Sequence, residues 1–416
     1  MGCSISHLQK VANKMQLDPA SGVWPKEKIT RSHRYISCLT PSSEDGFKFY
    51  RLKNASLKKG AYSSVYIDAI EVMSGKPCAY KIRRHQAPAS FNPLELPSAH
   101  PQKLRTHSQN SENTLPQISI LEDTERLDCG NYADQEIQFE GESEEARNLH
   151  LLRCEVERNP ELKKLLPLDA SGKPYIPFVE LLDVVKWADR EDLVLEKGDL
   201  TLQNYIQHPA DYKASADKTW TFAKQLLAIL KLLEEMDVVL PDFKSKNTII
   251  TLANDALKLI DFDAIIRLPS DDPTPCNEIQ ALHTAHYLTR KNSQMLKEAR
   301  TNNAARKALQ YKQRVSFAHT LFELLRQFPI SIVDEKSQEL HIKKKQNYTE
   351  FDLTKTTAFA KMPKDLQNLF HTLLDDKLPS LNEAELDRPL KKEYEKVYNT
   401  ICRAHPIGDV LTDPVV

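Results

Sequence analysis

The chain has 416 residues, of which 40% are hydrophobic and 28% are charged, and its mean hydropathy is −0.51. This profile is typical of a globular protein and excludes collagen-like, fibrous and membrane-spanning classes. The 57 basic and 58 acidic residues nearly cancel, so the overall charge gives no support for a nucleic acid as the main partner. The seven cysteines are scattered without a paired CxxC spacing, which argues against a zinc or dithiol redox site.

The N-terminus carries a lipidation pattern. The chain begins MGCSIS, in which Gly2 becomes an acceptor for myristate once the initiator methionine is removed. Cys3 is a candidate for palmitoylation, and the basic stretch Lys10 to Arg34 would add attraction to anionic lipid, because one myristoyl chain holds a protein only weakly. We therefore expect residues 1–45 to be an acylated, flexible tether to the cytoplasmic face of a membrane.

Short strand-like segments dominate the chain between residues 46 and 197. They are residues 65–67, 78–82, 178–182 and 192–196. Residues 142–157 instead have the periodicity of a helix. Residues 85–135 are rich in His, Ser, Pro, Asn and Gln, and this composition predicts a mobile insertion.

After Gly198 the character of the sequence changes to helical. Apolar residues recur at helical spacing at Phe222, Leu226, Ile229, Leu230 and Leu233, and helices are expected to continue to residue 401. The sequence therefore predicts an α+β protein with a small sheet domain at 46–197, a larger helical domain at 198–405 and a tail at 406–416.

One stretch holds the residue types that phosphoryl transfer needs. Asp242 is followed by Lys244 and Asn247, and Asp261 follows after one hairpin. A carboxylate can orient an attacking hydroxyl and accept its proton, a lysine can contact the γ-phosphate, and Asn and Asp oxygens suit Mg²⁺. Apolar residues flank each polar one, which would hold the loop on strands.

This stretch resembles the protein kinase superfamily. LPDFKSKN at residues 240–247 is similar to the family's HRDLxxxN loop, and DFD at residues 261–263 is similar to its DFG. The resemblance implies a bilobal fold, with a small antiparallel-sheet lobe carrying one main helix and a larger helical lobe. It also implies that Asp242 is the catalytic base, that Lys244 contacts phosphate, and that Asn247 and Asp261 bind the metal.

The resemblance extends upstream. CAYK at residues 78–81 is similar to the family's VAIK, which implies that Lys81 binds the ATP phosphates and pairs with a glutamate of the following helix. Glu145 is the first choice for that glutamate, with Glu142 and Glu144 as alternatives. LKKGAYSSVY at residues 57–66 looks like the nucleotide-covering loop, and LVLEKGDL at residues 193–200 resembles the hinge. The further nucleotide contacts implied are Leu57, Gly60, Val65, Ala79, Glu196 and Gly198.

The sequence also departs from the family pattern. Lys58 and Ser63 replace two glycines of the covering loop, which restricts how closely its backbone can approach phosphates. Pro241 stands where the family has Arg, Asp263 replaces the Gly after the metal-binding Asp, and Gln313 occupies the place of an anchoring Asp.

The resemblance implies an atypical Ser/Thr protein kinase that uses ATP and Mg²⁺ on a protein substrate. The chain is similar to effector kinases that bacteria inject into host cells, and this similarity implies a location at a host membrane. A pseudokinase scaffold is an alternative because of the degraded glycine loop, and a small-molecule kinase of the aminoglycoside or choline type is another because of IDFD at residues 260–263. Lys244 favours the protein-kinase branch. The basic pairs at 58–59 and 83–84 would suit a polyanionic activator such as an inositol phosphate.

Overall fold

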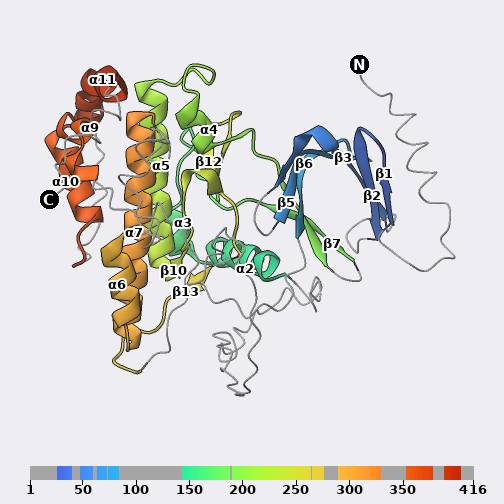
Figure 1. The fold of residues 1–416 in the computed structure, drawn as a ribbon, viewed down its shortest axis with the longest axis horizontal. Helices are drawn as coiled ribbons and strands as arrows, with labels where there is room; N and C mark the ends of the chain where they lie inside the picture. The colour runs from blue at the N-terminus through green and yellow to red at the C-terminus, as the bar shows by residue number, and fades with distance from the viewer. Residues whose placement is uncertain are drawn as a thin grey trace, which may run out of the picture. The chain divides into compact units, whose positions relative to one another are not determined.

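The computed structural model describes residues 26–39, 47–59, 63–72, 74–83, 143–187, 190–263, 265–275, 289–328, 353–377 and 388–403 (Figure 1). All of them belong to one contact unit, Met1–His85 with Glu142–Val416. An antiparallel sheet precedes a largely helical region, which confirms the α+β class. Gly2, Cys3, Gly60, the predicted insertion and the predicted tail lie outside the described residues.

The N-terminal half builds one eight-stranded sheet. Its strands are β1 (Lys26–Ile29), β2 (His33–Leu39), β3 (Phe47–Lys53), β4 (Leu57–Lys59), β5 (Ser63–Glu71), β6 (Pro77–Arg83), β7 (Leu181–Lys186) and β8 (Glu191–Glu196). The order is β1-β2-β3-β5-β6-β8-β7, with β4 paired to β5. The sheet curls so that β3 and β7, which are not neighbours in the order, approach each other: the Tyr50 hydroxyl on β3 donates a hydrogen bond to the Asp183 carboxylate on β7 at 2.7 Å.

The sheet begins earlier than the sequence analysis predicted. β1 and β2 fall within residues 1–45, so that segment is not a flexible tether throughout. Ile36 and Cys38 on β2 are buried against Tyr50 and Leu52 on β3. The apolar alternation in β2 covers only two core residues among polar neighbours, which is too short a pattern to distinguish a strand from a polar linker.

Helix α2 (Glu144–Arg158) carries an acidic residue into the interior. The Ser143 hydroxyl caps it by accepting a hydrogen bond from the Ala146 N–H at 3.2 Å. Ala146, Leu149, Leu152 and Val156 form its buried face, and Glu145 lies among them with no exposed surface. α2 ends two residues before Pro160, which begins the short helix α3 (Pro160–Lys164), because proline is tolerated in the first helical turn.

The C-terminal half is mainly helical, as predicted. Its helices are α4 (Leu202–Gln207), α5 (Ala216–Glu235), α6 (Arg290–Glu298), α7 (Asn302–Arg326), α9 (Thr357–Ala360), α10 (Lys364–Leu373) and α11 (Arg388–Arg403). Its short strands are β9 (Leu200–Thr201), β10 (Val238–Val239), β11 (Thr248–Thr251), β12 (Ala256–Leu259) and β13 (Ile266–Arg267). α5 and α7 pack side by side (Figure 1). No helix among the described residues is both long and apolar enough to span a bilayer.

α7 forms the centre of this region. From Tyr311 to Gln327 every side chain is buried, including several polar ones. Buried polar groups must find hydrogen-bond partners inside the protein. Three of these polar side chains, Lys312, Gln313 and Glu323, have partners on the loop between β10 and β11, so α7 positions that loop.

Candidate active site

The loop between β10 and β11 is attached to α7 at several points. The Gln313 side-chain oxygen accepts a hydrogen bond from the Leu240 N–H at 2.8 Å, and its amide nitrogen donates to the Val238 carbonyl at 3.2 Å. The Phe243 ring stacks on Phe317, with 3.6 Å between ring centroids. Gln313 therefore anchors this loop through its main chain, although it is not the aspartate that the kinase family has there.

Lys312 is a functional candidate that the sequence analysis missed. Its ammonium group donates a hydrogen bond to the Pro241 carbonyl, and the side chain has no exposed surface. Burial lowers the pKa of Lys312 to about 8; the charge of Asp242 opposes this shift and that of Lys244 adds to it. The only feature of the sequence that points to Lys312 is its position next to Gln313. Its role becomes visible only in the structure, where α7 packs under the loop.

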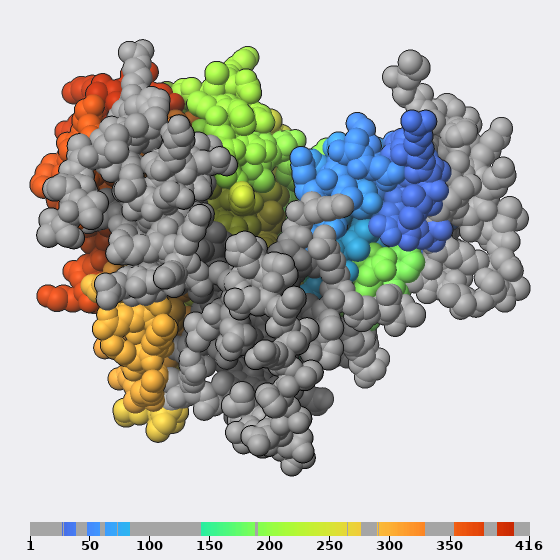
Figure 2. All heavy atoms as spheres, viewed as in Figure 1, coloured from blue at the N-terminus to red at the C-terminus, as the bar shows by residue number. Residues whose placement is uncertain are grey.

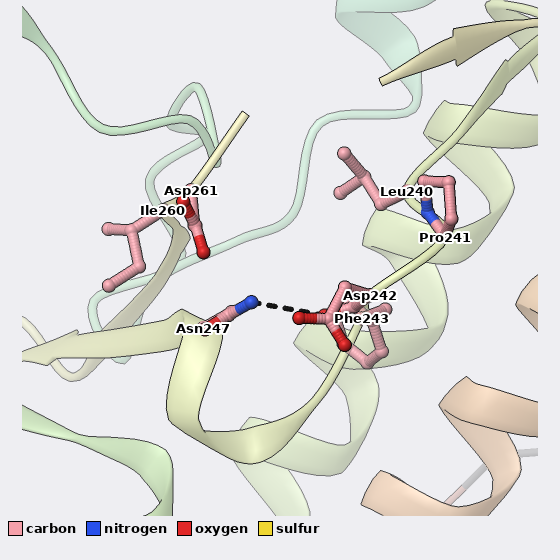
Figure 3. Close-up of a pocket in the computed structure, with 7 residues that line it drawn as sticks. All are labelled: Leu240, Pro241, Asp242, Phe243, Asn247, Ile260 and Asp261. Carbon is pink, nitrogen blue, oxygen red and sulfur yellow. Dashed lines mark hydrogen bonds between the residues drawn. The ribbon is translucent and has the colours of Figure 1, made fainter. Parts of the chain in front are cut away.

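The loop presents two of the predicted residues, Asp242 and Asn247, to one small pocket, and Asp261 lines the same pocket from the segment after β12 (Figure 3). The Lys244 ammonium group contacts the Asp242 carboxylate at 2.5 Å. The Asn247 amide nitrogen donates to the Asp242 main-chain carbonyl at 3.1 Å, which leaves the amide oxygen as the atom that can ligate a cation. The pocket is lined by Leu240, Pro241, Asp242, Phe243, Asn247, Ile260 and Asp261.

Lys81 on β6 lies at the centre of a charged cluster. Its ammonium group is 2.8 and 2.7 Å from the two carboxylate oxygens of Glu145 and 3.0 Å from Asp261. Asp263 lies 3.4 Å from the same group and 2.8 Å from the Arg83 guanidinium. Of the glutamates considered from sequence, Glu145 is thus the one placed against Lys81. Glu144 is exposed, and Glu142 lies outside the described residues.

The cluster is short of positive charge, because three carboxylates share two cations. Burial lowers the pKa of Lys81, but the attraction of Glu145, Asp261 and Asp263 outweighs burial and raises that pKa above its ordinary value. Burial raises the pKa of Glu145; Lys81 opposes this shift and Asp263 adds to it. Loss of the Glu145 proton is therefore costly unless a further cation binds near the cluster.

The carboxylates of the same cluster form a candidate site for a divalent cation. One carboxylate oxygen from each of Glu145, Asp261 and Asp263 lies within 4.8 Å of the others, and Mg²⁺ prefers oxygen ligands of this kind. Asp261 has a φ of 70°, in the left-handed region that a residue other than glycine adopts at a cost of roughly 1 kcal/mol or more. In this backbone conformation the Asp261 carboxylate contacts the Lys81 ammonium group at 3.0 Å.

Three predicted nucleotide contacts lie on the strands around Lys81. Leu57 is on β4, Val65 on β5 and Ala79 on β6. Val65 pairs directly with Lys81 in the antiparallel register, and Ala79 precedes Lys81 by two positions, so both share its face of the sheet. This face is where a ligand of Lys81 would lie. Leu57 instead pairs with Tyr66 and packs against the core cluster on the opposite face, so the prediction that it contacts a ligand beside Lys81 is wrong, because neighbouring residues of a strand alternate between faces.

The predicted hinge follows β8. The Glu196 carboxylate accepts hydrogen bonds from Lys258 at 2.6 Å. The Glu196 N–H donates to the Glu180 carbonyl at 2.8 Å, so both the side chain and the main-chain donor of this predicted contact are already engaged. Gly198 approaches β11 closely, since a Cβ there would lie 2.7 Å from Ile249 side-chain atoms. Only glycine fits this approach without displacing Ile249.

Comparison with known proteins adds no assignment. No family model matches the chain, and no curated protein is significantly similar to it. The case for a function therefore rests on the residues and contacts described above.

Proposed function

We propose that the chain is an ATP- and Mg²⁺-dependent phosphotransferase with a bilobal kinase-like fold, which transfers the γ-phosphate to a Ser or Thr hydroxyl of a protein. The observation that carries the proposal is the meeting of Lys81, Glu145 and Asp261. They come from β6, α2 and the segment after β12, separated by 64 and 180 residues from Lys81. A buried lysine held by one carboxylate and touching a second is the arrangement that phosphate binding beside a metal requires.

Each residue has a role in this proposal. Lys81 would bind phosphate oxygens, and Glu145 would hold its ammonium group in place. Asp242 would orient the attacking hydroxyl and accept its proton, while Lys244 would offset negative charge beside it. Asn247 and Asp261 would hold Mg²⁺, with Asp263 near enough to assist. When bound, Mg²⁺ would offset the charge of the phosphates.

A small-molecule kinase is the second candidate, and Asp263 is the observation that favours it. This carboxylate replaces the glycine of the protein-kinase motif, and it is paired with Arg83 and Lys81. A third acid in the cluster suits the IDFD motif of small-molecule kinases to which residues 260–263 are similar. The two candidates share the phosphate chemistry and differ only in the hydroxyl that attacks.

The proposal is tested by transfer of labelled γ-phosphate from Mg-ATP, with the full chain, on protein mixtures and on small hydroxyl metabolites. Asp242→Asn is expected to lower turnover by about 10² to 10⁴-fold, while Asp211→Asn, an exposed aspartate of α4's following turn, leaves it unchanged. Transfer to metabolites alone selects the second candidate. Binding of ATP in a thermal-shift assay without any transfer, even when host cytosol is added, identifies a pseudokinase.

The membrane anchor is part of the same proposal. Gly2 would carry myristate and Cys3 palmitate, which would hold the chain at the cytoplasmic face of a membrane. Labelling in cells with an alkyne analogue of myristate should mark the chain and not its Gly2→Ala variant. Equal labelling of both proteins would rule out Gly2 as the site that accepts myristate.

A further inference from the structure

The outer face of β2 and β3 is basic. In the antiparallel register His33 lies opposite Lys53, and Tyr35 lies opposite Arg51. These four side chains share one face, because alternate residues of a strand point the same way. The opposite face holds the core residues Ile36, Cys38, Tyr50 and Leu52. On the basic face the next pair, Ser37 and Phe49, is buried, so the accessible part of this face is its end beside the turn between β1 and β2. The atoms of β1–β3 form part of the surface drawn in dark blue (Figure 2).

The turn between β1 and β2 extends this face and is held in place. The Asn54 side-chain amide donates to the carbonyls of Thr30 at 3.0 Å and Arg31 at 3.3 Å. The Asn54 N–H also donates to the Ser32 carbonyl at 3.0 Å. Since Asn54 directly follows Lys53, these bonds fix exposed Arg31 near the basic pair of β3.

Within the described part of the chain, the positive charge on this face is not balanced by ion pairs. Among the described residues, Arg31, Arg51 and Lys53 take part in none of the ion pairs. Asp68 is close enough to interact electrostatically with Lys53, but its carboxylate pairs with the Lys197 ammonium group at 2.8 Å. Burial lowers the pKa of His33, and the charges of Arg51 and Lys53 lower it further, as a local positive potential requires.

We propose that this basic face, formed by Arg31, His33, Arg51 and Lys53, binds the surface of an anionic lipid membrane. Neighbouring strands lie about 4.8 Å apart and alternate residues about 7 Å apart. These spacings are within the Debye length of about 8 Å at physiological salt, so the cations act on a charged surface together. Ile29, at the end of β1, is 67% exposed and supplies an apolar side chain beside Arg31 for the headgroup boundary.

The position of the face in the chain favours a membrane over other polyanions. It begins with β1 at Lys26, directly after the segment whose Gly2 and Cys3 carry the lipidation pattern. One acyl chain binds reversibly, and a second signal is needed for stable attachment. A basic face on the first described strands after the anchor adds a signal of this kind to the acyl chains. The inference complements the proposed anchor, and its test uses unacylated protein so that the two can fail separately.

The test is co-sedimentation of the full, unacylated chain with vesicles of phosphatidylcholine alone or with about 30 mol% phosphatidylserine. Arg51→Ala/Lys53→Ala is expected to weaken partitioning into the anionic vesicles by about 25-fold, since each cation near the surface contributes about fivefold. The control Lys163→Ala/Lys173→Ala removes the same charge from exposed positions elsewhere and should change partitioning less than twofold. Arg51→Lys/Lys53→Arg should retain binding, which separates charge from folding.

Three outcomes would overturn the proposal. The wild-type chain could bind both vesicle types equally, or fail to bind the anionic ones at low salt. The Arg51→Ala/Lys53→Ala variant could bind as well as the wild type while unfolding at the same temperature. A homopolymer RNA could bind more tightly than the anionic vesicles and depend on the same two residues, in which case the face recognises a nucleic acid.

Discussion

Lys312 allows a quantitative test of how α7 supports the loop. Its buried ammonium group donates to the Pro241 carbonyl, and burial lowers its pKa to about 8 despite the opposing charge of Asp242. In the unfolded chain this lysine has its ordinary pKa of 10.5. Between these two values the unfolded chain binds more protons than the folded one, so the free energy of unfolding rises with pH.

The magnitude follows from the two pKa values. At about 1.4 kcal/mol per pH unit, keeping Lys312 charged in the folded protein costs about 3 kcal/mol at pH 7. At pH 10 the folded side chain is neutral, and about 1 kcal/mol of that cost remains. Lys312→Met loses the hydrogen bond but carries no charge. The stability of the wild type relative to this variant should therefore rise by about 2 kcal/mol between pH 7 and pH 10.

Urea unfolding of both proteins at a series of pH values measures this difference, and other titrating groups cancel because they are common to both. Lys163→Met, at an exposed position, serves as the control and should show no such trend. A wild-type advantage that is the same at pH 7 and pH 10 would refute the assignment of Lys312 as a buried cation under the loop.

Three further predictions concern the site and the hinge. Lys81→Met leaves the buried Glu145 carboxylate without its cation, so the free energy of unfolding measured in urea titrations should fall by about 3 to 5 kcal/mol. Adding Glu145→Gln should recover most of this loss. A double variant that loses as much stability as Lys81→Met would contradict the pairing. Gly198→Ala brings a Cβ to 2.7 Å from Ile249 and should lower the free energy of unfolding by about 1 to 3 kcal/mol. Adding Ile249→Ala should remove the clash and reduce this loss. An unchanged melting temperature for Gly198→Ala would argue against the close approach. Asp263→Gly removes one of three clustered carboxylates, so calorimetric Mg²⁺ affinity without nucleotide should drop about tenfold; equal affinities would exclude Asp263 from the cation site.

Some of the site could be predicted because its residues are close in sequence. Asp242, Lys244 and Asn247 lie within one loop, and Asp261 follows a hairpin whose two strands, β11 and β12, have clear apolar patterns. Local spacing of this kind is visible without tertiary structure. The periodicity of α2 likewise predicted a helix there.

Other features depended on how the elements pack. The sequence offered three glutamates at the start of α2, and the burial of its Ala146, Leu149 and Leu152 face selected Glu145 for Lys81. Lys312 looks like an ordinary helical lysine until α7 is seen beneath the Pro241 carbonyl. The strands β1 and β2 carry too few core residues for their pattern to be recognised.

The sequence by itself determined the α+β class, the change from a strand-rich part to a mainly helical part after Gly198, and the residue types available for phosphate and metal chemistry. These follow from local periodicity and spacing, which act over a few residues. The tertiary structure alone decided that Lys81 meets Asp261 across 180 residues, and that a basic face lies opposite the core of β2 and β3. Contacts at such separations are set by which apolar faces are buried together, because burial of apolar surface is the main driving force that orders the elements in space.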